Sequence, residues 1–273
     1  MGLSGHGYMD SSATSPDSHP YEAIFLSPHL DDAVLSCGGT IHLLTQAGKP
    51  VLVVSITAGD PPAGEPSPFA KNLHARWQLA TDSITLRRAE DVEACVNLGA
   101  DWLHWQIPDC IYRRNTVNGN PLYDRAEALF GSIDSYDMNL VANLSQQLES
   151  LPATDSVYVP LAVGNHVDHQ LTRLAAEVWL ESSLLLYYEE YPYAQADSQL
   201  AIALGDDGQW RADVVHLEPA NIEARIQAIA RYRSQISAFF TDLEDLSVQV
   251  NRHVLKVGGE RYWTRTRCSI FRH

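Results

Sequence analysis

Ala23-Ile24-Phe25-Leu26 runs directly into Ser27-Pro28-His29-Leu30-Asp31-Asp32, and this stretch indicates how the chain folds. Because the first four residues are all apolar, they predict a buried strand over residues 21–26. From Asp32 onward, apolar residues recur at helical spacing until Gly48 and Pro50, which end the helix. Residues 51–56 predict a second buried strand. This strand–helix–strand order is typical of a parallel sheet with a right-handed crossover.

The same alternation continues to about residue 190. Three more strands and three more helices are expected, at residues 102–105, 156–159 and 184–188 and at residues 84–98, 140–151 and 170–181. We therefore predict an α/β fold with a doubly wound, mostly parallel, Rossmann-like sheet flanked by helices. The remaining chain mixes strand and helix patterns, which predicts a mixed C-terminal extension.

The chain has no compelling domain boundary beyond its first residues. Residues 1–20 are rich in Gly, Ser, Asp and Pro and have no hydrophobic period, so we expect a flexible arm. Residues 21–273 are expected to form a single domain. Within it, residues 57–82 and 106–132 read as two long loops, and loops of this length are often functional lids. We expect them to recognise the substrate.

The overall charge narrows the range of partners. The chain has 19 basic and 34 acidic residues, a net charge of −15, which disfavours nucleic acid and anionic membrane surfaces. A small neutral or cationic substrate fits better. No apolar run reaches the roughly 18 residues of a membrane span, and the four cysteines form no C-x-x-C pair. These features favour a cytoplasmic protein with reduced thiols, and a homo-oligomer is compatible with the sequence.

Two clusters of potential metal ligands follow predicted strands. One contains His29, Asp31 and Asp32, and the other is His166-Val167-Asp168-His169. The carboxyl ends of parallel strands meet at one edge of a sheet, so both clusters should meet there. A His and a carboxylate from one cluster with a His from the other would give three ligands and an open position, as in catalytic zinc sites.

A water-activating metal site also needs a base that stays off the metal. Either aspartate of the first cluster could bind metal while the other faces the bound water, whose pKa the metal would lower to about 7. Likewise, either histidine of the second cluster could bind metal while the other faces the substrate, with Asp168 orienting an imidazole. Each cluster alone has simpler explanations, such as a helix N-cap. Their joint occurrence at two strand ends favours the metal site.

These motifs resemble those of the LmbE/PIG-L family of zinc-dependent N-deacetylases. The first family motif, H-P-D-D-E, corresponds to His29-Leu30-Asp31-Asp32-Ala33, and the second, H-P-D-H, corresponds to the cluster at residues 166–169. The resemblance extends to Arg87-Arg88-Ala89-Glu90 and Tyr232-Arg233-Ser234-Gln235. Three residues depart from the pattern: Leu30 and Val167 replace prolines, and Ala33 replaces a glutamate. The last change means that the substrate does not follow from the resemblance.

The resemblance implies a role for each matching residue. The implied zinc ligands are His29, Asp32 and His169. The implied catalytic residues are Asp31 as the general base, His166 as the group that polarises the amide carbonyl or stabilises the oxyanion, and Asp168 as the acid that orients a histidine. Arg87 is the implied substrate-binding residue.

The expected activity is hydrolysis by zinc-bound water of an acetyl or other acyl group from the amine of an N-acylated amino sugar or glycoconjugate. Fe²⁺ could replace Zn²⁺, because a set of two histidines and a carboxylate suits both ions. Two alternatives stay open. One is a Rossmann-like module that binds a sugar or nucleotide without hydrolysis, and the other is a hydrolase of a non-sugar amide.

Overall fold

The computed structural model describes residues 20–76, 83–206 and 208–266. The expected flexible arm therefore lies almost wholly outside the described residues. Seven strands form one sheet with the order β3-β2-β1-β4-β5-β7-β6. Their bounds are β1 Tyr21–Ser27, β2 Val51–Ser55, β3 Asp101–His104, β4 Thr154–Pro160, β5 Leu185–Tyr188, β6 Trp210–Val215 and β7 Glu260–Arg265.

The first five strands are parallel, and β7 and then β6 join one edge of the sheet through antiparallel pairings. β1 lies between β2 and β4, while β7 pairs with β5 and then with β6. Strand order therefore reverses between β1 and β4, the switch point at which open α/β sheets bind ligands. The predicted C-terminal extension thus continues the main sheet, and the predicted doubly wound, mostly parallel fold is confirmed.

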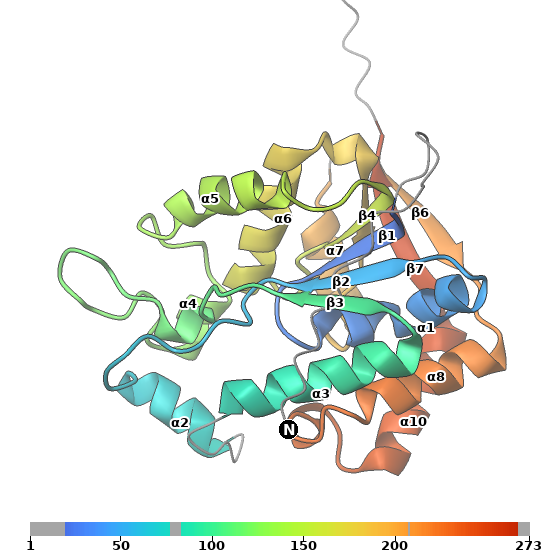
Figure 1. Cartoon of the computed structure of the whole chain (residues 1–273), viewed down its shortest axis with the longest axis horizontal. Coiled ribbons are helices and arrows are strands. Elements are labelled where there is room, and N and C mark those ends of the chain that lie inside the picture. Colours follow the sequence, from blue (N-terminus) through green and yellow to red (C-terminus); the bar gives the residue numbers. More distant parts are fainter. Residues whose placement is uncertain (1–19, 77–82, 207, 267–273) are drawn as a thin grey trace, which may run out of the picture.

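Helices cover both faces of the sheet (Figure 1). One layer contains α1 Asp32–Gln46, α3 Ser83–Leu98, α8 Pro219–Ile229 and α10 Leu243–Val257. The other contains α5 Met138–Leu148, α6 Val167–Trp179 and α7 Asp197–Leu204. Along β1, Ala23 and Phe25 pack into the first core, whereas Ile24 and Leu26 pack into the second. This burial on both faces explains why β1 is apolar at four successive positions, residues 23–26.

The two predicted loops are more ordered than expected. The prediction for residues 57–82 is wrong in part, because α2 Pro68–Arg76 forms there, and residues 77–82 lie outside the described residues. Ser67 begins this helix by accepting a hydrogen bond from the backbone N–H of Ala70 (3.1 Å). Proline at the first helical position is favourable, but the surrounding Pro-Gly composition concealed the helix.

Residues 57–82 and 106–132 are called the first and second excursions below, because both contain more than loop. The second excursion contains only the 3-10 turn η1 Cys110–Tyr112 and the short helix α4 Ala126–Leu129. It packs against α2 through a third apolar cluster, which includes Ala70, Leu73, Ile111 and Leu129. The short elements η2 Ser182–Leu184, η3 Tyr193–Gln195 and α9 Ile236–Phe239 complete the chain. Two segments far apart in sequence therefore build one wall beside the switch point.

Helix α6 begins at Val167, three residues before the predicted start, so the second metal-ligand cluster lies in its first turn. Of the helices in the described ranges, none is both long and apolar enough to cross a bilayer. The single domain over residues 21–273, the homo-oligomer and the cytoplasmic location stay predictions.

Candidate metal centre and active site

Both metal-ligand clusters lie at the carboxyl ends of neighbouring strands. β1 and β4 run parallel and in register, and the chain leaves each strand into a helix, α1 or α6. The imidazoles of His29, His166 and His169 each place a nitrogen within 4.8 Å of the others. The structure therefore brings together the residues that the sequence predicted would meet.

The β1–α1 turn is held by its own residues. Ser27 Oγ donates to the carbonyl of His29 (2.6 Å) and accepts from the backbone N–H of Ala33 (3.0 Å). Asp31 occupies the N-cap position of α1, but its side chain makes no capping hydrogen bond. Its carboxylate is therefore not explained as a helix cap and faces the cavity instead.

Asp32 lies between two imidazoles. Its Oδ2 is 3.0 Å from His29 Nδ1 and 3.2 Å from His169 Nε2. Burial alone would raise the pKa of Asp32, but His169 and His29 together hold it well below its usual range. Burial likewise opposes protonation of His169, yet Asp32 and Glu190 raise the pKa of His169 to about 9. Two imidazole nitrogens thus meet at one carboxylate oxygen of Asp32.

A carboxylate fixes the far nitrogen of each of these imidazoles. Asp168 Oδ2 is 3.2 Å from His29 Nε2, and Glu190 Oε1 is 3.1 Å from His169 Nδ1. A proton on each far nitrogen leaves the near nitrogen free to bind metal, as in the carboxylate–histidine pairs of known metal sites. Asp168, which belongs to the second cluster, thus contacts the ring of His29, which belongs to the first.

The two supporting carboxylates are buried and held by distant residues. Glu190 accepts the backbone N–H groups of Ala162 (2.6 Å) and Val163 (3.0 Å). Asp168 accepts a hydrogen bond from the backbone N–H of Cys110 (3.1 Å), and it forms an ion pair with the buried guanidinium of Arg113. Both carboxylates are fully buried, so these contacts compensate for the cost of removing the charges from water.

His29 and His169 belong to two candidate donor sets, which differ in whether Asp32 or His166 is the third ligand. His166 is the N-cap of α6, and its Nδ1 accepts the backbone N–H of Asp168 (3.3 Å). Burial and the neighbouring His29 hold the pKa of His166 well below its ordinary value. His166 is therefore neutral with its proton on Nε2, a hydrogen-bond donor, and the set with Asp32 fits a metal better.

A cavity of about 240 Å³ opens over these groups. The sequence-predicted residues that line it are His29, Asp31, Asp32, Arg87, His166 and His169, while Asp168 lies fully buried behind them. A guanidinium nitrogen of Arg87 is 3.7 Å from Asp31 Oδ2. Its neighbour Arg88 instead binds the carbonyl of Ala58 and the carboxylate of Asp60, so Arg87 is the arginine of the cavity.

Both excursions contribute walls to this cavity. Phe69 and Leu73 come from α2, and Asp109, Ile111 and Phe130 come from the second excursion. Burial raises the pKa of Asp31, and Arg87 offsets only part of that effect. A carboxylate with a raised pKa, next to the convergent donor atoms and inside a walled cavity, has the properties of a general base.

Sequence reasoning missed Glu190 and the role of Arg113. Glu190 follows β5, the strand beside β4, so the rule about carboxyl ends of parallel strands could have identified it. Arg113 lies in the second excursion, where no periodic pattern indicates which way a side chain points. Its contact with Asp168 spans 55 residues.

Comparison with known proteins identifies relatives with a shared chemistry. The chain is 28% identical over 258 residues to a 2'-N-acetylparomamine deacetylase of Niallia circulans, covering 88% of this chain and 89% of that protein. A 2'-N-acetylparomamine deacetylase of Streptomyces fradiae is 28% identical over 177 residues, covering 63% of this chain and 57% of the relative.

The solved structures that resemble this chain include further deacetylases. A zinc-inhibited teicoplanin deacetylase superimposes with a TM-score of 0.78 at 30% identity, over 91% of this chain and 99% of its own. The A40926 pseudoaglycone deacetylase superimposes with a TM-score of 0.69 at 27% identity, over 91% and 99% of the two chains. The family model for PIG-L, GlcNAc-PI de-N-acetylase, matches residues 24–180, more than half of the chain. The chain therefore belongs to the PIG-L family.

Proposed function

We propose that this chain is a metal-dependent N-deacetylase that releases the amine of an N-acetylated amino sugar or glycoconjugate. The relatives in Niallia circulans and Streptomyces fradiae are deacetylases of 2'-N-acetylparomamine, and the structural neighbours are deacetylases of teicoplanin and of the A40926 pseudoaglycone. One observation carries the proposal. Two carboxylate-supported imidazoles direct their near nitrogens at one oxygen of Asp32, beside a second aspartate that makes no capping bond.

His29, Asp32 and His169 are the proposed metal ligands. Two nitrogens and a carboxylate oxygen suit Zn²⁺, and also Fe²⁺. The ion would polarise the amide carbonyl and lower the pKa of the attacking water. Asp168 and Glu190 each hold a proton on the far nitrogen of a ligand imidazole, which aims the near nitrogen at the metal position.

Asp31 is the proposed general base. Its carboxylate lies in the cavity beside the metal ligands, and burial raises its pKa toward the range in which a carboxylate accepts a proton efficiently. The Arg87 guanidinium at 3.7 Å opposes that rise in pKa by favouring the ionised carboxylate. Arg87 also faces the cavity, and we propose that it binds the substrate.

His166 is the proposed oxyanion donor. Its Nδ1 accepts a backbone N–H, so the neutral ring presents Nε2–H to the carbonyl oxygen of the substrate. The new C–O bond forms as Asp31 takes a proton from water. The C–N bond then breaks, and Asp31 passes that proton to the leaving nitrogen. The second proton of the water also ends on the nitrogen at neutral pH, so the products are a carboxylate and a protonated amine.

Release of primary amine from a panel of N-acetylated amino sugars tests this proposal. We expect turnover in the metal-loaded protein, loss of turnover with a chelator, and recovery when Zn²⁺ or Fe²⁺ is added back. Metal analysis should find about one ion per chain, from three ligands and one open position. Protein purified without chelator that contains no stoichiometric divalent ion would favour the non-hydrolytic sugar- or nucleotide-binding module. Turnover confined to non-sugar amides would support the other alternative.

A further inference from the structure

The catalytic cavity continues into an open groove. At about 240 Å³ the cavity is below the roughly 300–1,000 Å³ of pockets that enclose drug-sized ligands. A groove of about 840 Å³ adjoins it, and Phe130 and Tyr193 line both. A glycoconjugate with its acetylated amine at the metal ligands would therefore extend past these two aromatic rings. We propose that the groove is a distal subsite for a second, neutral hydroxylated ring of the substrate, a proposal that rests on the deacetylase function above.

The aromatic entrance to the groove is fixed in place. The Phe130 ring lies edge-on to His166, with centroids 5.5 Å apart, and also contacts Tyr193. The Asn165 side chain donates to the carbonyls of Phe130 (2.9 Å) and Gly131 (3.0 Å). Gln170 donates to the Gly131 carbonyl as well. Because Phe130 stays 42% exposed yet is held from behind, it forms a preorganised platform for the apolar face of a sugar ring.

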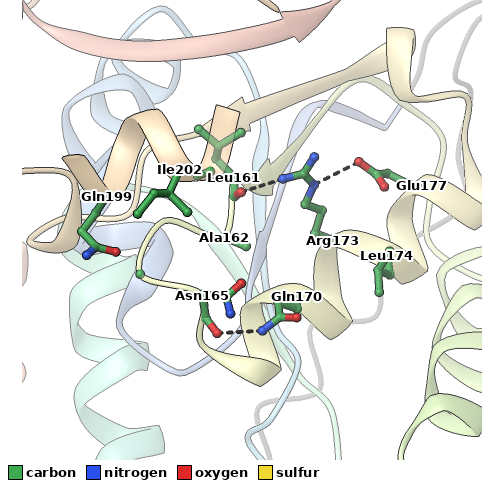
Figure 2. A pocket seen from close by; sticks show the side chains of 11 residues that line it. Leu161, Ala162, Asn165, Gln170, Arg173, Leu174, Glu177, Gln199 and Ile202 are labelled. Atoms are coloured by element: carbon green, nitrogen blue, oxygen red, sulfur yellow. Dashed lines mark hydrogen bonds and ion pairs between the residues drawn. The ribbon is translucent and has the colours of Figure 1, made fainter. Parts of the chain in front are cut away.

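The far wall of the groove comes from α7 and the residues before it. Gln195, Ala196, Gln199 and Ile202 line this wall. Figure 2 shows Gln199 and Ile202 on their helix across from Asn165, where the groove continues into a further pocket between α6 and α7. Within the described ranges, the side-chain amides of Gln195 and Gln199 have no hydrogen-bond partner. Free amides both donate and accept, which matches hydroxyl groups.

The charge of the groove selects among possible distal rings. Among the described residues that line it, none carries a formal charge, whereas the cavity contains Asp31, Asp32, Asp109 and Arg87. A distal ammonium group would find no ionic partner in the groove. A neutral ring with hydroxyl groups finds amides and aromatic faces, and this difference commits the proposal to that class.

Steady-state kinetics on two substrates tests the subsite. One is N-acetylglucosamine, and the other is a neutral disaccharide that carries the same residue at its non-reducing end. We expect the wild-type protein to have a kcat/KM about tenfold higher for the disaccharide, from one additional aromatic contact and hydrogen bond. Ala196→Trp, which fills the groove, should remove most of that preference, and Gln199→Ala should lower it roughly threefold to fivefold.

Matched controls separate the groove from general effects. Ser198→Trp places the same ring on α7 outside the groove, and Gln146→Ala removes an exposed glutamine from α5. Both controls should retain the wild-type preference. An unchanged preference in Ala196→Trp, with a folded protein by circular dichroism, would overturn the subsite alone. A tenfold preference for a disaccharide with an ammonium-bearing distal ring would overturn its assignment to neutral rings. If the wild-type protein hydrolyses neither substrate, the deacetylase function fails and the subsite with it.

Discussion

The β1–α1 turn and the β4–α6 loop each supply half of the candidate site, but they are held in different ways. In the first, the contacts of Ser27, His29, Asp32 and Ala33 span at most six residues. In the second, Glu190 binds backbone groups 27 and 28 residues away, and Arg113 reaches Asp168 across 55 residues. The turn of the first half is held mainly by contacts close in sequence, although Asp168, 139 residues away, fixes the ring of His29. The second half depends on the completed fold.

The backbone shows the same difference. In the β4–α6 loop, Ala162 and Asn165 both have a φ of 63°, a left-handed conformation that non-glycine residues seldom adopt. Glu190 accepts the backbone N–H groups of Ala162 and Val163, so the same carboxylate that orients His169 also holds the strained loop. Strain at a functional site persists when surrounding contacts over-determine it. Metal binding by the second half should therefore be sensitive to remote substitutions.

The largest expected effect comes from the local half. Asp31→Asn should lower kcat by about 10²- to 10⁴-fold, because the amide cannot take a proton from water. Metal content, measured by mass spectrometry, should stay at the wild-type level, since Asp31 is not a proposed ligand. Asp32→Asn is the matched control in the same turn and should lose metal as well as activity. A near-wild-type kcat in Asp31→Asn would contradict the proposed base.

The next effect concerns stability and the remote support. Arg113→Gln should destabilise the fold by about 3 kcal/mol, because Asp168 and Asp137 would lose the buried cation that pairs with both. Chemical denaturation measures this, and metal affinity should fall together with it. Arg114→Gln is the neighbouring control, since that exposed side chain binds only backbone carbonyls. An equal loss of stability in both variants would argue against a special role for Arg113.

The same local-versus-remote division explains what the sequence could predict. Continuous apolar strands and helical periodicity are local patterns, so β1, α1, β2 and the doubly wound fold were predictable. The first cluster of potential metal ligands could be recognised because its residues are close together in the chain. Glu190 and Arg113 act over long sequence separations, and Arg113 lies in an excursion without periodicity. Helix α2 was missed because its short pattern is set among prolines and glycines.

Glu190→Gln sharpens the comparison with a smaller effect. The neutral amide cannot hold the far proton of His169 as strongly, so metal affinity should fall by about 10- to 100-fold, as for other groups that support metal ligands. Competition with a fluorescent chelator measures the affinity. Glu189→Gln removes a neighbouring buried acid that binds Arg261 and Trp263. It should leave the affinity unchanged, and an equal loss in both variants would mean that general destabilisation is responsible.

The last expected effect is a pH dependence that reports on each half separately. Without metal, Asp32 and Glu190 raise the pKa of His169 from 6.5 to about 9, and Asp32 and Asp168 raise the pKa of His29 in the same direction. The proton on His169 stabilises the metal-free fold fully below pH 6.5, and this contribution is lost as the pH rises through about 9. Metal must displace that proton, so affinity should rise about tenfold per pH unit for each proton displaced.

The gap in melting temperature between metal-loaded and metal-free protein should therefore widen from pH 6 to pH 9. In Glu190→Gln the pKa of His169 moves back toward 6.5, so the pH dependence of metal affinity above pH 7 should lose about one proton, while the contribution of His29 remains. Glu189→Gln should keep the wild-type slope. If Glu190→Gln also kept that slope, the remote carboxylate would not control the protonation of the second half, and the two halves would be equally self-contained.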